Sequence, residues 1–192
     1  IISTMLQHAD GPLEQKVERI MPTLKVILLG GMQEPGHGVG TTLAGLLEAD
    51  QLADVAAAPD ELVPRAIEEG LRWISPIGTQ TRQTLDELEL GGVTLPAGAS
   101  LGVLVSSANR DEAVWGDAAD VFDVHRPRRN HAAFGFGPHF CSGHHFSRVQ
   151  MRIALSRLIE RYPGLRTHPE RPPVFTGWEF RAPRNLDVVL RP

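Results

Sequence analysis

One stretch of this 192-residue chain carries its sharpest pattern: Phe134-Gly135-Phe136-Gly137-Pro138-His139-Phe140-Cys141-Ser142-Gly143. It holds the only cysteine, so an intrachain disulfide is impossible and a disulfide-rich secreted scaffold is excluded. The glycines on either side of Phe136 permit positive φ and therefore a tight turn. The pattern predicts a turn that presents a thiol and is followed directly by a helix.

Four interpretations of Cys141 compete. A lone cysteine is most often a small buried hydrophobe. A structural zinc site could use His139, Cys141, His144 and His145, although ligands this close in sequence would be cramped. A catalytic thiolate needs a base that a third group orients; His139 is near, but no third member can be identified. The fourth interpretation is an axial haem ligand.

A haem ligand places specific demands on the chain. The thiolate must protrude from a turn towards a flat ring, and Gly135 and Gly137 let the backbone pass close to that ring. Gly143 lets the following helix begin against the ring, and the amides of its first turn favour thiolate over thiol. Phe134 can shield the sulfur from water. Such ligation pushes electron density onto iron and favours cleavage of the O–O bond.

Length and composition predict one globular domain with 42% hydrophobic and 22% charged residues. The net charge of -4 argues against a nucleic-acid binder. The longest apolar run, near residues 24–31, is well short of the ~20 residues that span a bilayer, so no membrane anchor is expected. The start, Ile1-Ile2-Ser3-Thr4, lacks both the pattern of a signal peptide and an initiator Met, which suggests a fragment.

Hydrophobic periodicity predicts a helix-rich fold. Residues 13–50 form one long helical pattern whose apolar positions include Val17, Ile20 and Leu24, with a fault at residues 34–38 where proline and glycine interrupt it. A short helix over residues 50–57 should be stopped by Pro59, and another is expected over 64–73. The helix after Cys141 should end at Pro163-Gly164.

Short strands are expected between and after these helices. Residues 88–90, 93–95 and 100–105 have strand character, with turns at Gly91-Gly92 and at Pro96-Ala97-Gly98. Residues 115–130 should form a long ordered loop, and residues 174–180 and 186–190 a terminal hairpin. The predicted fold class is mainly α with minor β sheets.

The cysteine stretch resembles the haem-binding pattern of the cytochrome P-450 superfamily, Phe-x-x-Gly-x-His/Arg-x-Cys-x-Gly. A second motif, Glu69-Gly70-Leu71-Arg72, resembles the family's Glu-x-x-Arg, although residues at i and i+3 on a helix are usually a solvated surface pair. The resemblance adds Arg126 and implies a buried structural triad of Glu69, Arg72 and Arg126 that pins the loop before Cys141. Residues 108–111 and Phe122-Asp123 are similar to bacterial members.

The resemblance implies the superfamily's fold in incomplete form, with residues 1–192 as the C-terminal part of one haem domain and the N-terminal part absent. It implies haem b, O2 and electrons from a ferredoxin or a reductase. The expected activity is hydroxylation or O-dealkylation of a small organic substrate in the cytoplasm, with aromatic molecules as one candidate class. The alternative is a non-catalytic haem-binding or degenerate fragment. The 192 residues alone should not turn over substrate.

The resemblance also assigns residues to roles. Cys141 is the expected iron ligand, with Phe134, Gly135 and Gly143 around the cofactor. His139 and Arg82 are the expected partners of the anionic haem propionates. The expected substrate-binding residues follow the helix that carries Glu69 and Arg72, or lie at the terminal turn: Ile77, Gly78, Thr79 and Trp178, the last within residues 175–178.

The distal helix departs from the family pattern of an acid followed by threonine. The stretch here is Gly30-Gly31-Met32-Gln33-Glu34-Pro35. If the motif is aligned with Glu34 as the acid, Pro35 occupies the position of the threonine. If the motif is aligned one residue earlier, Gln33 occupies the position of the acid and Glu34 that of the threonine. Thr41 and Thr42 lie about two turns further on. Glu34 is therefore the candidate catalytic residue, as a proton relay in O2 activation.

Arginines flank the cysteine stretch in a chain that is otherwise net acidic. Arg128 and Arg129 precede it, and Arg148 and Arg152 follow it. Such charges are often only a solvated face. Their position also predicts a docking surface for an acidic electron donor.

Overall fold

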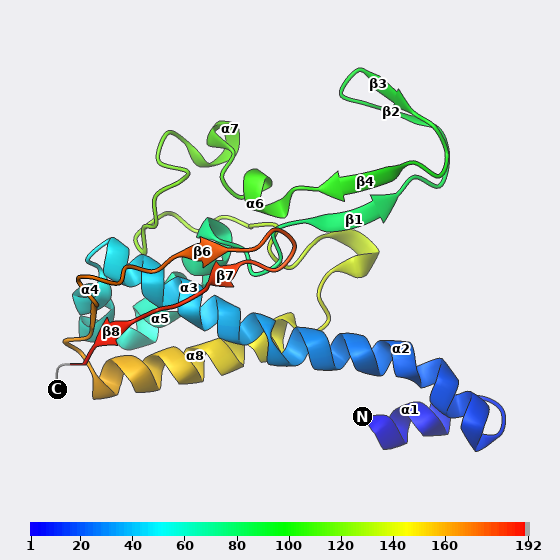
Figure 1. The fold of residues 1–192 in the computed structure, drawn as a ribbon, viewed down its shortest axis with the longest axis horizontal. Helices are drawn as coiled ribbons and strands as arrows, with labels where there is room; N and C mark the ends of the chain where they lie inside the picture. Colours follow the sequence, from blue (N-terminus) through cyan, green and yellow to red (C-terminus); the bar gives the residue numbers. More distant parts are fainter. Residues whose placement is uncertain (191–192) are drawn as a thin grey trace.

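The computed structural model describes residues 1–190 (Figure 1). The first half of the chain is helical: α1 (Ile2–His8), α2 (Leu13–Met32), α3 (Glu34–Glu48), α4 (Leu52–Ala57) and α5 (Pro59–Trp73). The second half alternates short strands and helices: β1 (Gln80–Gln83), β2 (Leu88–Leu90), β3 (Val93–Leu95), β4 (Ser100–Val103), α6 (Val105–Ala108), α7 (Glu112–Trp115), a 3-10 turn (Gly137–His139), α8 (His144–Arg161), β5 (Arg166–Thr167), β6 (Phe175–Thr176), β7 (Ala182–Pro183) and β8 (Val188–Val189). The prediction of a mainly α fold with minor sheets is confirmed.

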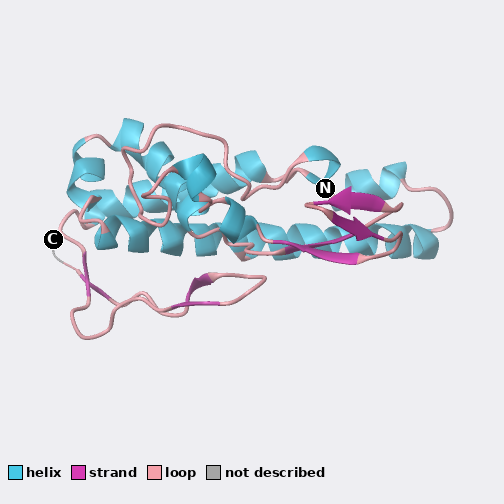
Figure 2. Ribbon diagram, turned by 90° about the horizontal axis from the view of Figure 1, so that it is seen from above, coloured by secondary structure: helices cyan, strands magenta, loops and turns pink. Residues whose placement is uncertain are grey.

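The core lies where α3, α5 and α8 pack together, with α4 at one end. Leu46, Ile67, Met151 and Leu155 are fully buried there. The α3–α5 contact is close because α5 carries Gly70, where a Cβ would collide with Thr42. Figure 2 shows the helices as one continuous body with the strands at its margins.

The predicted fault in the long helix lies between α2 and α3. Gln33 separates the two helices but keeps helical dihedrals, φ -92° and ψ -54°. Pro35 stands in the first turn of α3, where its missing N–H removes no hydrogen bond. The interruption therefore leaves the direction of the helix almost unchanged, and α2 and α3 run nearly in line in Figure 1.

The predicted start of α5 is wrong. The helix begins at Pro59, not at Pro64, which lies inside it. The amide of Leu62 donates to the carbonyl of Ala58 at 2.9 Å, so the first turn is closed before the second proline is reached. Pro59 thus both stops α4 and opens α5.

Four two-stranded sheets are present in the described residues. β2 and β3 form the predicted hairpin, and its turn places Gly91 and Gly92 at φ +60° and +80°. β1 was not predicted as a strand; it pairs antiparallel with β4. β4 stops at Val103, short of the predicted end, because α6 begins at Val105. The four-residue helices α6 and α7 are too short to show a period in sequence.

The predicted pairing of the terminal hairpin is wrong. β6 pairs with β7, and β8 pairs instead with β5, so that Arg166 lies opposite Val189. The reason is the tight turn at Gly177, whose φ of +103° reverses the chain directly after β6. Among residues 1–190, no helix combines the length and apolar composition that crossing a bilayer requires.

Candidate functional site

The cysteine turn is closed by its own backbone. The amide of Cys141 donates to the carbonyl of Phe134 at 2.9 Å, and the amide of Phe140 donates to that of Gly137 at 3.0 Å. Gly135 and Gly137 have φ of +71° and +66°, which side chains rarely allow. The turn thus presents Cys141, a free and half-buried thiol.

The thiol lies over the start of α8. A Cβ on Gly143 would lie 3.9 Å from Cys141 Sγ, and α8 begins at the next residue. The amide of His144 donates to the carbonyl of Cys141 at 3.3 Å. A helix N-terminus favours negative charge, and the sulfur stands at that end of α8.

β1 passes beside this turn and carries Arg82. A Cβ on Gly135 would lie 3.6 Å from Gln80 Nε2, and Arg82 Nη2 donates to Gln80 Oε1 at 2.8 Å. Arg82 and His139, at the end of the 3-10 turn, are both exposed. Two expected cofactor partners therefore belong to elements that meet at Gly135.

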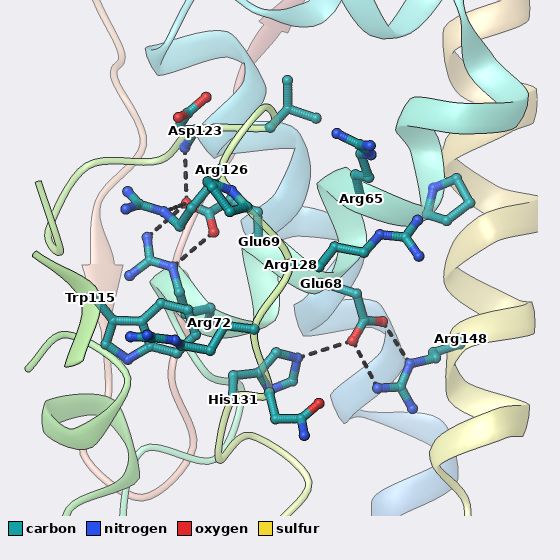
Figure 3. Close-up of a pocket in the computed structure, with 15 residues that line it drawn as sticks. Arg65, Glu68, Glu69, Arg72, Trp115, Asp123, Arg126, Arg128, His131 and Arg148 are labelled. Carbon is teal, nitrogen blue, oxygen red and sulfur yellow. Dashed lines mark hydrogen bonds and ion pairs between the residues drawn. The ribbon is translucent and has the colours of Figure 1, made fainter.

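Glu69, Arg72 and Arg126 come together around one carboxylate (Figure 3). Arg72 Nε and Nη2 donate to Glu69 Oε2 and Oε1 at 2.8 and 2.7 Å, and Arg126 Nε donates to Oε1 at 3.1 Å. The Arg72 side chain is 1% exposed and that of Glu69 6%. The solvated-pair interpretation is therefore wrong for Glu69 and Arg72.

The three side chains also hold the loop that leads to the cysteine turn. The amide of Asp123 donates to Glu69 Oε1 at 2.9 Å. The two guanidinium groups donate to backbone carbonyls, Arg72 to Asn109, Ala119 and Val121, and Arg126 to Ala118 and Val121. A loop without regular secondary structure thereby gains fixed partners for its carbonyl groups.

A second cluster, which the sequence analysis missed, surrounds Glu68. Arg148 Nε and Nη2 donate to its two oxygens at 2.6 and 2.8 Å, and His131 Nε2 lies 3.2 Å from Oε2 (Figure 3). Burial alone would raise the pKa of the Glu68 carboxyl, but the hydrogen bonds from Arg148 and His131 outweigh it and lower the pKa to about 2. The partners are 63 and 80 residues away, so no local pattern signals the cluster.

Glu34 lies in the first turn of α3, partly buried. Within residues 1–190, Glu34 Oε2 has no hydrogen-bond partner, and neither do His37 Nδ1 and Thr41 Oγ1 along the same helix. Thr42 Oγ1, by contrast, donates to the Gly38 carbonyl at 2.7 Å. Buried polar atoms without protein partners usually bind ordered water, so this side of α3 can hold solvent.

Three of the four expected substrate residues gather at one cavity. Gly78, Thr79 and Trp178 line a cavity of about 520 Å³, and the Trp178 side chain is 72% exposed. Ile77 does not line it; it pairs with Phe180 across the terminal turn. The amide of Gly78 donates to the Glu179 carbonyl at 2.8 Å, which fixes the two segments together.

The four flanking arginines differ in their environment. Arg128, Arg129 and Arg152 are exposed. The guanidinium of Arg148 is instead held by Glu68, so it is less available to a partner. A second cavity, of about 580 Å³, is lined by six arginines: Arg65, Arg72, Arg126, Arg128, Arg129 and Arg148.

The fold and the site define a class of helix-rich proteins in which a glycine turn presents a lone thiol over a helix N-terminus. The family model described as Cytochrome P450 matches residues 51–184. The chain belongs to the cytochrome P450 family.

The sequence is similar to bacterial proteins that are named as monooxygenases. The chain is 35% identical over 186 residues to the steroid C26-monooxygenase of Mycolicibacterium smegmatis, covering 96% of this chain and 46% of the relative. It is 42% identical over 161 residues to the 20-oxo-5-O-mycaminosyltylactone 23-monooxygenase of Streptomyces fradiae, covering 84% of this chain and 36% of the relative.

Solved structures show the same fold. A post-tailoring hydroxylase involved in himastatin biosynthesis superimposes with a TM-score of 0.85 at 29% identity, over 99% of this chain and 55% of that structure. The cytochrome P450 TbtJ1 gives 0.84 at 31% identity, over 98% and 50%. The chain thus spans about half the length of the proteins it matches.

Proposed function

We propose that this protein is a haem-thiolate monooxygenase in which Cys141 is the iron ligand. The observation that carries the proposal is the cysteine turn: a free, half-buried thiol over the first turn of α8. No group of three or more His, Cys, Asp or Glu in residues 1–190 is arranged to hold a metal ion, so the described residues give the zinc interpretation no support.

The residues around the thiol fit haem. Phe136 is 66% exposed and Phe140 is also exposed, so aromatic side chains lie open beside the thiol, as an apolar ring requires. Arg82 and His139 are exposed donors for the propionates. When bound, haem b supplies the iron that activates O2 and transfers oxygen to substrate.

The chain's own residues set the conditions for that chemistry. The Phe134 carbonyl accepts the Cys141 amide hydrogen and fixes the turn, and the sulfur stands beside the N-terminal end of α8, where negative charge is favoured. Glu34, with a buried carboxylate oxygen that has no partner in the described residues, holds and passes protons through water on α3. The triad of buried Glu69 and Arg72 with the partly buried Arg126 is structural and keeps the loop before Cys141 in place.

The substrate is a small organic molecule, oxidised by hydroxylation or O-dealkylation. The relatives named as steroid and mycaminosyltylactone monooxygenases support oxidation of an organic substrate. The cavity at Gly78, Thr79 and Trp178, together with Ile77, forms part of the substrate site. Residues 1–192 are the C-terminal part of one haem domain, located in the cytoplasm, and electrons come from an acidic ferredoxin or a reductase.

The test is the incorporation of labelled oxygen from ¹⁸O2 into the product. The protein made from its complete coding sequence is loaded with haem, supplied with electrons and ¹⁸O2, and offered a panel of small aromatic and steroid substrates. A monooxygenase places a single labelled oxygen atom in the oxidised product. A product that takes its oxygen only from water, or no oxidation of any substrate by a haem-loaded protein, would contradict the proposal.

A further inference from the structure

Glu68 joins three parts of the chain that are far apart in sequence. It stands on α5, and its carboxylate accepts two hydrogen bonds from Arg148 on α8, at 2.6 and 2.8 Å. The same carboxylate meets His131, in the loop before the cysteine turn. This geometry is the bidentate one that guanidinium and carboxylate groups prefer.

The His131 ring has a defined tautomer. Its Nδ1 accepts a hydrogen bond from the amide of Ala133 at 3.2 Å, so Nε2 carries the hydrogen and donates to Glu68. The side chain is only 4% exposed. Glu68 thereby fixes the backbone immediately before Phe134.

Arg148 connects the carboxylate to the cysteine turn. Its guanidinium carbon lies 4.3 Å from the centre of the Phe134 ring, and the Phe134 carbonyl accepts the amide hydrogen of Cys141. The hydrogen bond to Glu68 raises the pKa of Arg148, so the guanidinium stays charged. The Arg148 charge therefore lies against the ring of the residue whose carbonyl binds the Cys141 amide, and Glu68 is the charge that balances it.

We propose that Glu68 is a positioning residue that sets the electrostatic potential at Cys141. It holds the Arg148 guanidinium against Phe134 and neutralises its charge beside the thiolate. The inference rests on the proposed ligation of haem iron by Cys141. Groups that do not touch a metal but orient and polarise its ligand are known to tune such sites.

The test is the sign of the change in reduction potential in a double-mutant cycle. Glu68→Gln leaves Arg148 unbalanced, and the added positive charge favours the reduced haem, so the midpoint potential should rise. Arg148→Gln leaves Glu68 unbalanced and should lower it. The expected size is about tenfold in the reduction equilibrium, or ~59 mV for one electron. The double variant should return close to the unmutated protein, which a merely structural role would not produce.

Two variants serve as controls. Glu160→Gln removes a carboxylate near the C-terminal end of α8, where it pairs with the exposed Arg157, and should leave the potential unchanged. Glu68→Asp keeps the negative charge, so its midpoint reduction potential should stay close to that of the unmutated protein. Hydrogen exchange of the Ala133 amide, measured without haem, should accelerate in Glu68→Gln because His131 is released; this readout holds even if that variant binds haem poorly.

The outcomes separate the two proposals. If the unmutated protein binds haem without the strongly red-shifted CO complex of thiolate ligation, the proposed function is wrong, and this inference is wrong with it. If that complex forms but the two single variants shift the potential in the same direction or not at all, only the role of Glu68 is wrong. Unchanged exchange at Ala133 in Glu68→Gln would also overturn it.

Discussion

Glu34 carries its carboxylate at a helix N-terminus, where negative charge is favoured. Its carboxylate stands in the first turn of α3, with one oxygen buried and without a partner in residues 1–190. The unpartnered atoms of His37 and Thr41 lie further along the same helix. A carboxylate in that setting can exchange protons with ordered water, which is what a relay requires.

Replacing Glu34 by Gln removes the exchangeable proton and keeps the shape. We expect substrate binding to persist while electrons are diverted from product to hydrogen peroxide. The measurement is the ratio of product and peroxide formed to electrons consumed. Glu14→Gln, an exposed carboxylate of α2, is the matched control and should keep the original ratio. Full coupling in Glu34→Gln would show that the carboxylate is not a relay.

Single residues were predictable from sequence where their signal is local. Cys141 stands out because the glycines before it and the helix after it are neighbours in the chain. Glu68 does not, because its partners His131 and Arg148 lie far along the sequence and each alone reads as an ordinary polar residue. Only the packing of α5 against α8 makes them a cluster.

At the scale of elements, α5 organises the loop before the cysteine turn. Two adjacent carboxylates on this helix bind different parts of the loop (Figure 3). Glu69 binds Asp123 and Arg126. Glu68 binds His131 and also Arg148 on α8. The loop from α7 to the turn has little regular structure of its own. The two carboxylates therefore fix it together with Gln51 and Asn109, whose side chains accept the amide hydrogens of Val124 and Ala132.

Glu69→Ala should destabilise the protein by about 3–5 kcal/mol, because it leaves the buried Arg72 charge without its partner. Denaturant unfolding measures the loss, and haem content should fall with it. Glu61→Ala is the control on the same helix, since its pair with Arg65 is exposed and is worth at most ~1 kcal/mol. Equal, small losses in the two variants would contradict a buried structural triad.

Acid should destabilise the protein partly through Glu68. Its pKa lies at about 2 in the folded chain against 4.5 when unperturbed, so its contribution is complete above pH 4.5 and is lost as pH falls towards 2. We expect the melting temperature of Glu68→Gln to decline less steeply across that range than that of the unmutated protein. Parallel curves would show that the carboxylate is not held as the geometry implies.

Elements were predictable where one segment carries its own pattern. The β2–β3 hairpin and α8 follow from local turns and periodicity. The β5–β8 and β1–β4 pairs join segments separated by other structure, and the tight turn at Gly177 decides which strands are free to pair. Pairing between distant segments is a property of the packed molecule.

The whole molecule exposes an apolar surface along α2. Val26, Leu28 and Met32 are all exposed on this helix. Apolar patches of this kind usually mark an interaction surface. The chain spans about half the length of its relatives, which fits our proposal that it is the C-terminal part of a larger haem domain.

Charge on the molecular surface should govern delivery of electrons. Reversing the exposed Arg128 and Arg129 to Glu should slow reduction by an acidic donor and weaken its salt dependence, while substrate affinity stays the same. Stopped-flow reduction at several salt concentrations measures both. Reversal of the exposed Arg19 on α2 is the control. An unchanged rate in the Arg128 and Arg129 variant would remove this surface from the proposed docking site.

The most direct measurement is the absorption spectrum of the reduced, CO-exposed protein with and without the Cys141 thiol. The protein made from its complete coding sequence should show a Soret band shifted strongly to the red, as thiolate ligation produces. Cys141→Ala should abolish that shift and Cys141→Ser should largely lose it, even where haem is still bound. If Cys141→Ala keeps the red-shifted band, another group ligates the iron and the central claim is wrong.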